Sequence, residues 1–214
     1  MLVNEDKTFG GNDLFIDMLP KSSYGMTVQN CVHPSDWNRL KSFIEERANF
    51  KCECCDDKGP LDAHERWSYN EEEKTQKLMR IIAICKPCHE TTHMGLAQIN
   101  GREEAAFDRL MQVRKMDKPT ALKHLEDATK VKSRRDDIEW KQDFSILTDS
   151  GIRLVENIES KKRKFSEDES TSMRSSLLGN LSAQLGIYKP SIAPVLQQQT
   201  TPSQLETKKL TIKN

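Results

Sequence analysis

The sequence predicts an α+β protein in which a small strand–strand–helix module is flanked by α-helices and followed by a disordered C-terminal tail. Two C-x-x-C pairs enclose two short strand-like stretches, and a short histidine-bearing helix overlaps the second pair. Helical periodicity of apolar residues appears on both sides of this region. From about residue 154 the chain becomes rich in Lys, Ser, Thr, Gln and Pro, a composition typical of disorder.

These observations divide the chain into three expected parts. Residues 1–17 are mostly polar with a Gly-Gly pair, so we expect a flexible N-terminal arm, with its short apolar patch at 14–16 as the part that docks. Residues 18–153 form the expected folded domain, with the central module at about 50–95 and a helical remainder. Residues 154–214 form the expected disordered tail, which carries a basic cluster near its start.

Composition limits the classes of function. The chain has 214 residues and a formal net charge of zero, which excludes a global basic field, so any nucleic-acid binding must rest on local patches. It contains no apolar run long enough to span a membrane, and its N-terminus lacks signal-peptide features. We therefore expect an intracellular protein, in which reduced C-x-x-C pairs favour metal over disulfides.

The flanking helices follow from periodicity and capping. Ser35 is the expected N-cap of a helix that runs to about Ala48, with apolar residues at spacings of three and four. Later helices are expected near 105–113 and over 119–140, and a docked segment is expected at 143–147.

The central module is expected to hold two strands and a short helix. The stretches 61–67 and 76–84 are expected to be strands, separated by a charged connection. Pro87 suits the first helical position and Gly95 the position just past the end. On that helix His89 and His93 lie four residues apart, so their side chains leave the same face.

The cysteines predict a structural zinc site. The two C-x-x-C pairs supply four thiolates, Cys52, Cys55, Cys85 and Cys88. A closed shell of four sulfurs around Zn²⁺ leaves no position for a substrate, and its binding energy stabilises the fold. Cys54 is an alternative ligand to Cys55, although the x-x spacing favours Cys55. Cys31 is isolated and is expected to be a small core residue.

The histidines predict a second, open metal site. His64 lies within the first expected strand, and it is expected to face His89 and His93. Three imidazoles around a divalent ion leave coordination positions free, as a catalytic metal requires. Glu65 is the neighbouring carboxylate, whereas His124, in a charged helix, is expected to be exposed to solvent.

At these residues the chain resembles a known family. The C-x-x-C pair, the stretch Ala63-His64-Glu65-Arg66-Trp67 and the later C-x-x-C-H-x-x-x-H motif are similar to the HNH (ββα-metal) endonucleases, and more closely to a microbial HNH-type subgroup. The resemblance runs from about Met18 to Gly151 and leaves out the tail.

The resemblance implies a set of roles. A divalent ion (Mg²⁺, Mn²⁺, Ni²⁺ or Zn²⁺) would contact the scissile phosphate and the leaving 3′ oxygen, with His64, His89 and His93 as its ligands. Glu65 falls where the general base, usually a histidine, would lie. In the alternative assignment His64 is the base and Glu65 a metal ligand or orienting group. Arg80 lies near the position of the motif's asparagine, where it would hold a phosphate instead.

Two functions are therefore weighed. The first is a metal-dependent DNA endonuclease that hydrolyses phosphodiester bonds, with Arg66, Arg80 and Lys86 as phosphate contacts. The second is a catalytically inactive zinc module that binds nucleic acid or protein.

The tail suggests where the protein acts. Lys161, Lys162, Arg163 and Lys164 precede an acidic Ser-containing stretch, a pattern that resembles a nuclear localisation signal. A nuclear import receptor is the partner expected for this cluster, and without it the protein would stay cytoplasmic. Five apolar residues at 177–187 also suggest a short amphipathic helix that docks on a partner.

Overall fold

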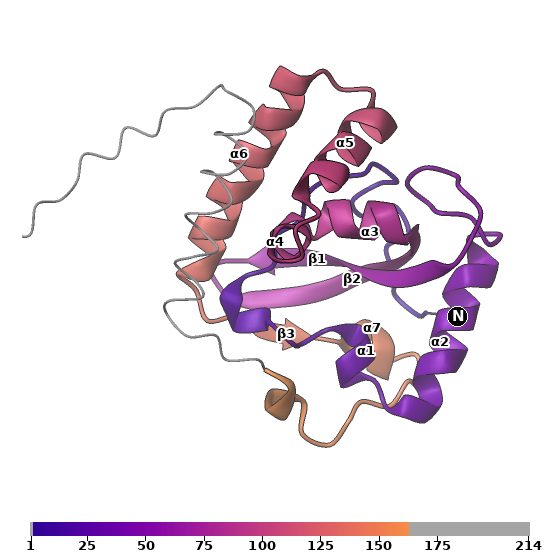
Figure 1. Cartoon of the computed structure of the whole chain (residues 1–214). Coiled ribbons are helices and arrows are strands. Elements are labelled where there is room, and N and C mark those ends of the chain that lie inside the picture. Colours follow the sequence, from indigo (N-terminus) through magenta and orange to yellow (C-terminus); the bar gives the residue numbers. More distant parts are fainter. Residues whose placement is uncertain (1, 163–214) are drawn as a thin grey trace, which may run out of the picture.

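The computed structural model describes residues 2–162, in which helices surround a long β-hairpin (Figure 1). A third, short strand extends the hairpin, so the sheet has the order β1-β2-β3. The elements in chain order are η1 (Lys21–Ser23), α1 (Val28–Cys31), α2 (Pro34–Arg47), β1 (Leu61–Asn70), β2 (Thr75–Cys85), α3 (Lys86–Thr92), α4 (Met94–Ile99), α5 (Glu103–Arg114), α6 (Lys118–Asp136), β3 (Lys141–Asp143), α7 (Ser145–Thr148) and η2 (Ile158–Lys161).

The hairpin register positions both ends of the central module. Strands β1 and β2 are antiparallel, and Leu61 at the start of β1 pairs with Cys85 at the end of β2. The preceding loop, which carries Cys52 and Cys55, therefore meets the end of β2. Both predicted strands are confirmed, although each is longer than expected, and a register shift lies between Arg66 and Trp67. Strand β3 runs parallel to β2.

Helices cover both faces of the hairpin. In Figure 1, α3 and α5 lie on one side of it and α1 and α7 on the other. Strand β2 is consequently buried nearly throughout its second half, where Ile81, Ile82 and Ile84 are fully buried. Burying a side chain of this size contributes about 1.5–3 kcal/mol, so this strand anchors the fold.

Helix α2 confirms the helix expected before the first cysteine pair, but its cap differs. The helix begins at Pro34, and its N-cap is His33, whose Nδ1 accepts a hydrogen bond from the Ser35 backbone N–H at 3.4 Å. Ser35 lies inside the first turn instead. The buried residues of α2 include Leu40 and Ile44, as the periodicity predicted.

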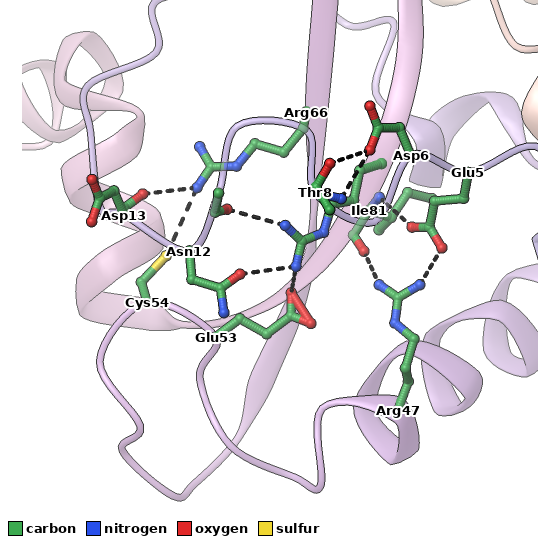
Figure 2. Close-up of polar contacts among 12 residues, drawn as sticks. Glu5, Asp6, Thr8, Asn12, Asp13, Arg47, Glu53, Cys54, Arg66 and Ile81 are labelled. Atoms are coloured by element: carbon green, nitrogen blue, oxygen red, sulfur yellow. Dashed lines mark hydrogen bonds and ion pairs between the residues drawn. The ribbon is translucent and has the colours of Figure 1, made fainter.

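The N-terminal arm is packed, which corrects the expectation of a flexible segment at 1–17. Leu2, Leu14 and Ile16 are buried in the core. Figure 2 shows the arm's polar contacts: the Glu5 carboxylate forms an ion pair with Arg47 of α2 and accepts a hydrogen bond from the Ile81 backbone N–H at 3.1 Å. The arm's few apolar residues are thus sufficient to order it.

The ordered chain also extends past residue 153, where the tail was expected to begin. Leu154 bridges to Val32, and the Val155 backbone N–H donates to the Cys31 carbonyl at 2.8 Å. Lys162, within the basic cluster, lies 2.9 Å from a carboxylate oxygen of Glu139. Lys161 ends η2, whereas Arg163, Lys164 and the apolar stretch at 177–187 lie outside the described residues, so nuclear import stays a prediction.

The helical remainder differs from expectation at two points. Helix α6 ends at Asp136, before Trp140, which packs its buried ring against Tyr69 with centroids 5.0 Å apart. His124 is half-buried and not exposed, because its Nε2 accepts a hydrogen bond from the Ile16 backbone N–H at 3.1 Å. Within residues 2–162, every helix is too short or too polar to cross a membrane.

Candidate metal centre

Four cysteine sulfurs converge where the start of β1 meets the end of β2. We call Cys52–Cys55 the first knuckle and Cys85–Cys88 the second knuckle. The first is held against β2 by a hydrogen bond from the Glu53 backbone N–H to the Ala83 carbonyl at 2.9 Å. The second continues from β2 into the first turn of α3. The sequence therefore delivers two sulfurs from a loop and two from a strand–helix junction.

The geometry of this four-sulfur group suits a tetrahedral zinc ion. The sulfurs of Cys52, Cys55, Cys85 and Cys88 all lie within 4.8 Å of one another. The measured separation between the sulfurs of Cys55 and Cys85 is 3.7 Å. A tetrahedron with Zn–S bonds of about 2.3 Å has edges of about 3.8 Å. All four cysteines are free thiols, so no disulfide competes for these sulfurs.

The remaining two cysteines do not belong to the four-sulfur group. The Cys54 side chain turns toward β1, where its sulfur accepts a hydrogen bond from Arg66 at 3.8 Å (Figure 2). The structure thus brings Cys55, and not Cys54, to the four-sulfur group. Cys31 is fully buried in the core, and burial raises the pKa of its thiol to about 12.

Three histidines form a second group beside the first. His64 comes from β1 and His89 from α3, and His93 is the residue that directly follows α3. Their ring centroids lie 4.9–5.2 Å apart, and one nitrogen of each ring lies within 4.8 Å of the others. Helix α3 ends at Thr92, and Gly95 lies inside α4, which begins at Met94, and not just past the end of α3.

His64 shows most clearly that this group suits an ion. The residue is 2% exposed, and neither of its ring nitrogens has a hydrogen-bond partner within the described residues. A buried polar group without a partner costs about 1–3 kcal/mol, which a metal ligand bond would offset. Burial holds the pKa of His64 well below its usual value, and burial lowers the pKa of His93 to about 3. Neutral imidazole is the form that binds metal.

Asp62 is a functional candidate that the sequence reasoning missed. Its Oδ2 lies 3.0 Å from Nδ1 of His89. A carboxylate accepts hydrogen bonds, so Nδ1 of His89 carries the proton and Nε2 is left to bind an ion. The signal was present in the sequence, because residues two apart on a strand, here Asp62 and His64, share a face.

Glu65 does not join the histidines. Along β1 it alternates with His64, so its side chain leaves the opposite face of the strand. There its Oε1 accepts a hydrogen bond from the Val28 backbone N–H at 2.6 Å. Burial raises the pKa of this carboxyl group. The role of general base, or of metal ligand, expected for Glu65 therefore conflicts with its placement under α1.

Two of the three expected phosphate contacts are internal. Arg66 is 1% exposed, donates to the Asp13 carbonyl at 3.2 Å and lies 4.0 Å from the centre of the Phe15 ring. Arg80 is 6% exposed and donates to the arm and to Glu53 (Figure 2). Both guanidinium groups fasten the arm to the sheet instead of facing solvent. Lys86, at the start of α3, is exposed.

Comparison with known proteins found no relative of this chain. No protein-family model matches the chain, and no curated protein or solved structure matches it either. The two ligand groups share the first turn of α3, because Cys88 and His89 are consecutive.

Proposed function

We propose that the protein is a metal-dependent endonuclease that hydrolyses phosphodiester bonds in DNA, with a structural zinc in the four-sulfur group and a catalytic divalent ion at the three histidines. The observation that carries the proposal is the convergence of His64, His89 and His93, with the buried His64 ring lacking any partner among the described residues. The resemblance of the sequence motifs to HNH endonucleases supplies the reaction and the substrate class.

The two ligand groups differ in whether they leave coordination positions open, and this difference separates a structural ion from a catalytic one. Four thiolates complete a tetrahedral shell, which supports structure only. Three imidazoles leave positions open for a phosphate oxygen and water, and an ion held there would polarise the phosphate and stabilise the leaving oxygen. Because the donors are nitrogens with no carboxylate among them, the site favours Zn²⁺ or Ni²⁺ over Mg²⁺.

The protein's own side chains would prepare this site before substrate arrives. His64, nearly inaccessible to solvent, serves better as a ligand than as a base that exchanges protons with water. Asp62 holds the His89 ring in one orientation and one tautomer. Lys86 is exposed one residue after Cys85 and two residues before Cys88, where it can attract a phosphate.

Plasmid nicking tests the proposal. The wild-type protein should convert supercoiled DNA in the presence of Mn²⁺, Ni²⁺ or Zn²⁺, and His89→Ala should lower the rate by at least about 100-fold. His33→Ala is the matched control, because His33 is an exposed histidine far along the chain from the site. Equal nicking by the wild type and His89→Ala would refute the proposal.

A second function is favoured by the placement of Glu65, Arg66 and Arg80. With these side chains directed away from the histidines or into the core, the site lacks the expected base and two expected phosphate contacts. A site without this base and these phosphate contacts is consistent with a catalytically inactive zinc module that binds nucleic acid or protein. Metal analysis separates the two functions: one tightly held zinc, with no second ion bound at millimolar Mn²⁺ or Ni²⁺, would favour the inactive module.

A further inference from the structure

Arg109 reaches the four-sulfur group from a helix outside the strand–strand–helix module. It lies on α5, which packs beside α3 (Figure 1). Its Nε lies 3.4 Å from the sulfur of Cys88, and its Nη2 lies 3.9 Å from the sulfur of Cys85. Its side chain is 15% exposed. The guanidinium group therefore donates to both sulfurs of the second knuckle.

The same guanidinium group also holds the first knuckle. Its Nη2 lies 2.5 Å from Oδ2 of Asp57, two residues after Cys55. Its Nη1 donates to Gln112 at 2.9 Å, which fixes the plane of the group. A single side chain thus contacts the second knuckle and the residue two positions after the first knuckle, and each of its nitrogens has a partner.

Charge explains what such a contact would do. Four thiolates around one Zn²⁺ carry a net double negative charge, and this charge sits in a largely buried place. Partners that donate to first-shell ligands orient them and change metal affinity. A guanidinium group suits this role because it stays charged and presents several donors in a fixed plane.

We propose that Arg109 is a positioning residue of the four-sulfur zinc site. Its N–H groups donate to the sulfurs of Cys85 and Cys88, offset their charge and slow the loss of zinc, while its contact with Asp57 keeps the first knuckle closed. Helix α5 is thereby tied to the metal. The inference rests on the zinc part of the proposed function and not on nuclease activity.

The test compares zinc release from the full-length, zinc-loaded protein. The variants are Arg109→Gln and Arg109→Lys, and the matched control is Arg102→Gln. Arg102 is the N-cap of the same helix and contacts α3 through Glu90 at 2.6 Å, so its hydrogen bond is to a carboxylate and not to a cysteine sulfur. Transfer of zinc to a colorimetric chelator should be about 10-fold faster for Arg109→Gln, intermediate for Arg109→Lys and within about twofold of wild type for the control.

Alkylation distinguishes a contact with sulfur from a packing effect. A hydrogen bond to a zinc-bound thiolate lowers its nucleophilicity, so in Arg109→Gln iodoacetamide should modify Cys85 and Cys88 faster, with less change at Cys52, as mapped by mass spectrometry. No faster modification of Cys85 and Cys88 in Arg109→Gln would overturn the proposal. Zinc release equal to that of Arg102→Gln, or purified protein without zinc, would overturn it too.

Two further variants test the role of Arg109 if Arg109→Gln does not fold. Arg109→Lys retains the charge but loses the forked donors, and Asp57→Asn weakens the contact on the exposed side of the first knuckle. Both should still release zinc faster than Arg102→Gln. None of these measurements uses DNA. If the protein does not nick DNA but Arg109→Gln still releases zinc faster than Arg102→Gln, the proposed nuclease function is refuted and the role of Arg109 stands.

Discussion

The carboxylate of Asp62 lies 3.0 Å from Nδ1 of His89, and the two residues come from different elements, β1 and α3. The contact crosses from the hairpin to the helix at the point where His64 also faces His93, with ring centroids 4.9 Å apart. A carboxylate behind a histidine ligand fixes the ring and raises its basicity. Through this pair, the hairpin therefore influences how tightly the proposed site binds its ion.

Asp62→Asn should weaken binding of a second ion without unfolding the protein. The amide keeps the size of the side chain but removes the charge that favours the Nδ1-protonated tautomer of His89. We expect affinity for Co²⁺ or Ni²⁺ at the histidines to fall roughly 10-fold, measured by calorimetry on zinc-loaded protein. Asp127→Asn, which alters an exposed carboxylate on α6, is the control. Unchanged affinity in Asp62→Asn would show that Asp62 does not act through His89.

Glu65→Gln separates a structural role from a catalytic one. The Glu65 carboxylate accepts a hydrogen bond from the Val28 backbone N–H at 2.6 Å, and a glutamine oxygen can accept the same bond. We therefore expect Glu65→Gln to keep nicking activity within about threefold of the wild type and Glu65→Ala to lose about 1–3 kcal/mol of unfolding free energy. Urea denaturation and plasmid nicking measure the two. Loss of nicking in well-folded Glu65→Gln would restore Glu65 as the base.

The pattern of ligands was accessible from the sequence because spacing alone constrains it. Two equal C-x-x-C pairs identified the four sulfurs, and a spacing of four residues on a helix identified His89 and His93 as neighbours. Asp62 could also have been found, since strand alternation places it with His64. The same alternation separates Glu65 from His64 on the regular part of β1.

Contacts between segments that lie far apart in the sequence could not be predicted from residue spacing. Arg66 and Arg80 pair across the hairpin and bury their charge beneath the N-terminal arm, and this depends on where the arm packs. Arg109 lies 21 residues beyond Cys88, on a helix with no metal-binding motif. Local composition described the arm as polar and mobile, whereas a few buried residues such as Leu14 order it.

The choice between Cys54 and Cys55 can be tested by zinc content. Cys55→Ser removes one of the four converging sulfurs, so we expect loss of the tightly bound zinc and a melting temperature lower by about 6–12 °C, which corresponds to about 3 kcal/mol for a chain of this size. Cys54→Ser removes a sulfur that contacts Arg66, and should keep its zinc. Metal analysis and thermal unfolding of both variants decide the matter, and loss of zinc from Cys54→Ser alone would reverse the assignment.

His124 should make stability fall as the solution becomes acidic. Its Nε2 accepts a hydrogen bond from Ile16, and its half-buried ring lies near Arg114 of α5 and Asp127 of its own helix. Burial is the main cause that lowers the pKa of His124, and Arg114 adds to it, while Asp127 opposes it. Because the pKa is lower in the folded protein, the stabilisation is present above the ordinary value of 6.5 and is lost as pH falls through the folded value.

His124→Gln isolates this contribution, since the glutamine oxygen can accept from Ile16 without titrating. Urea unfolding at pH 7.5 and at pH 5 should show a larger loss of unfolding free energy for the wild type than for His124→Gln. Equal losses in the wild type and His124→Gln would mean that the arm's attachment at Ile16 does not respond to protonation of His124.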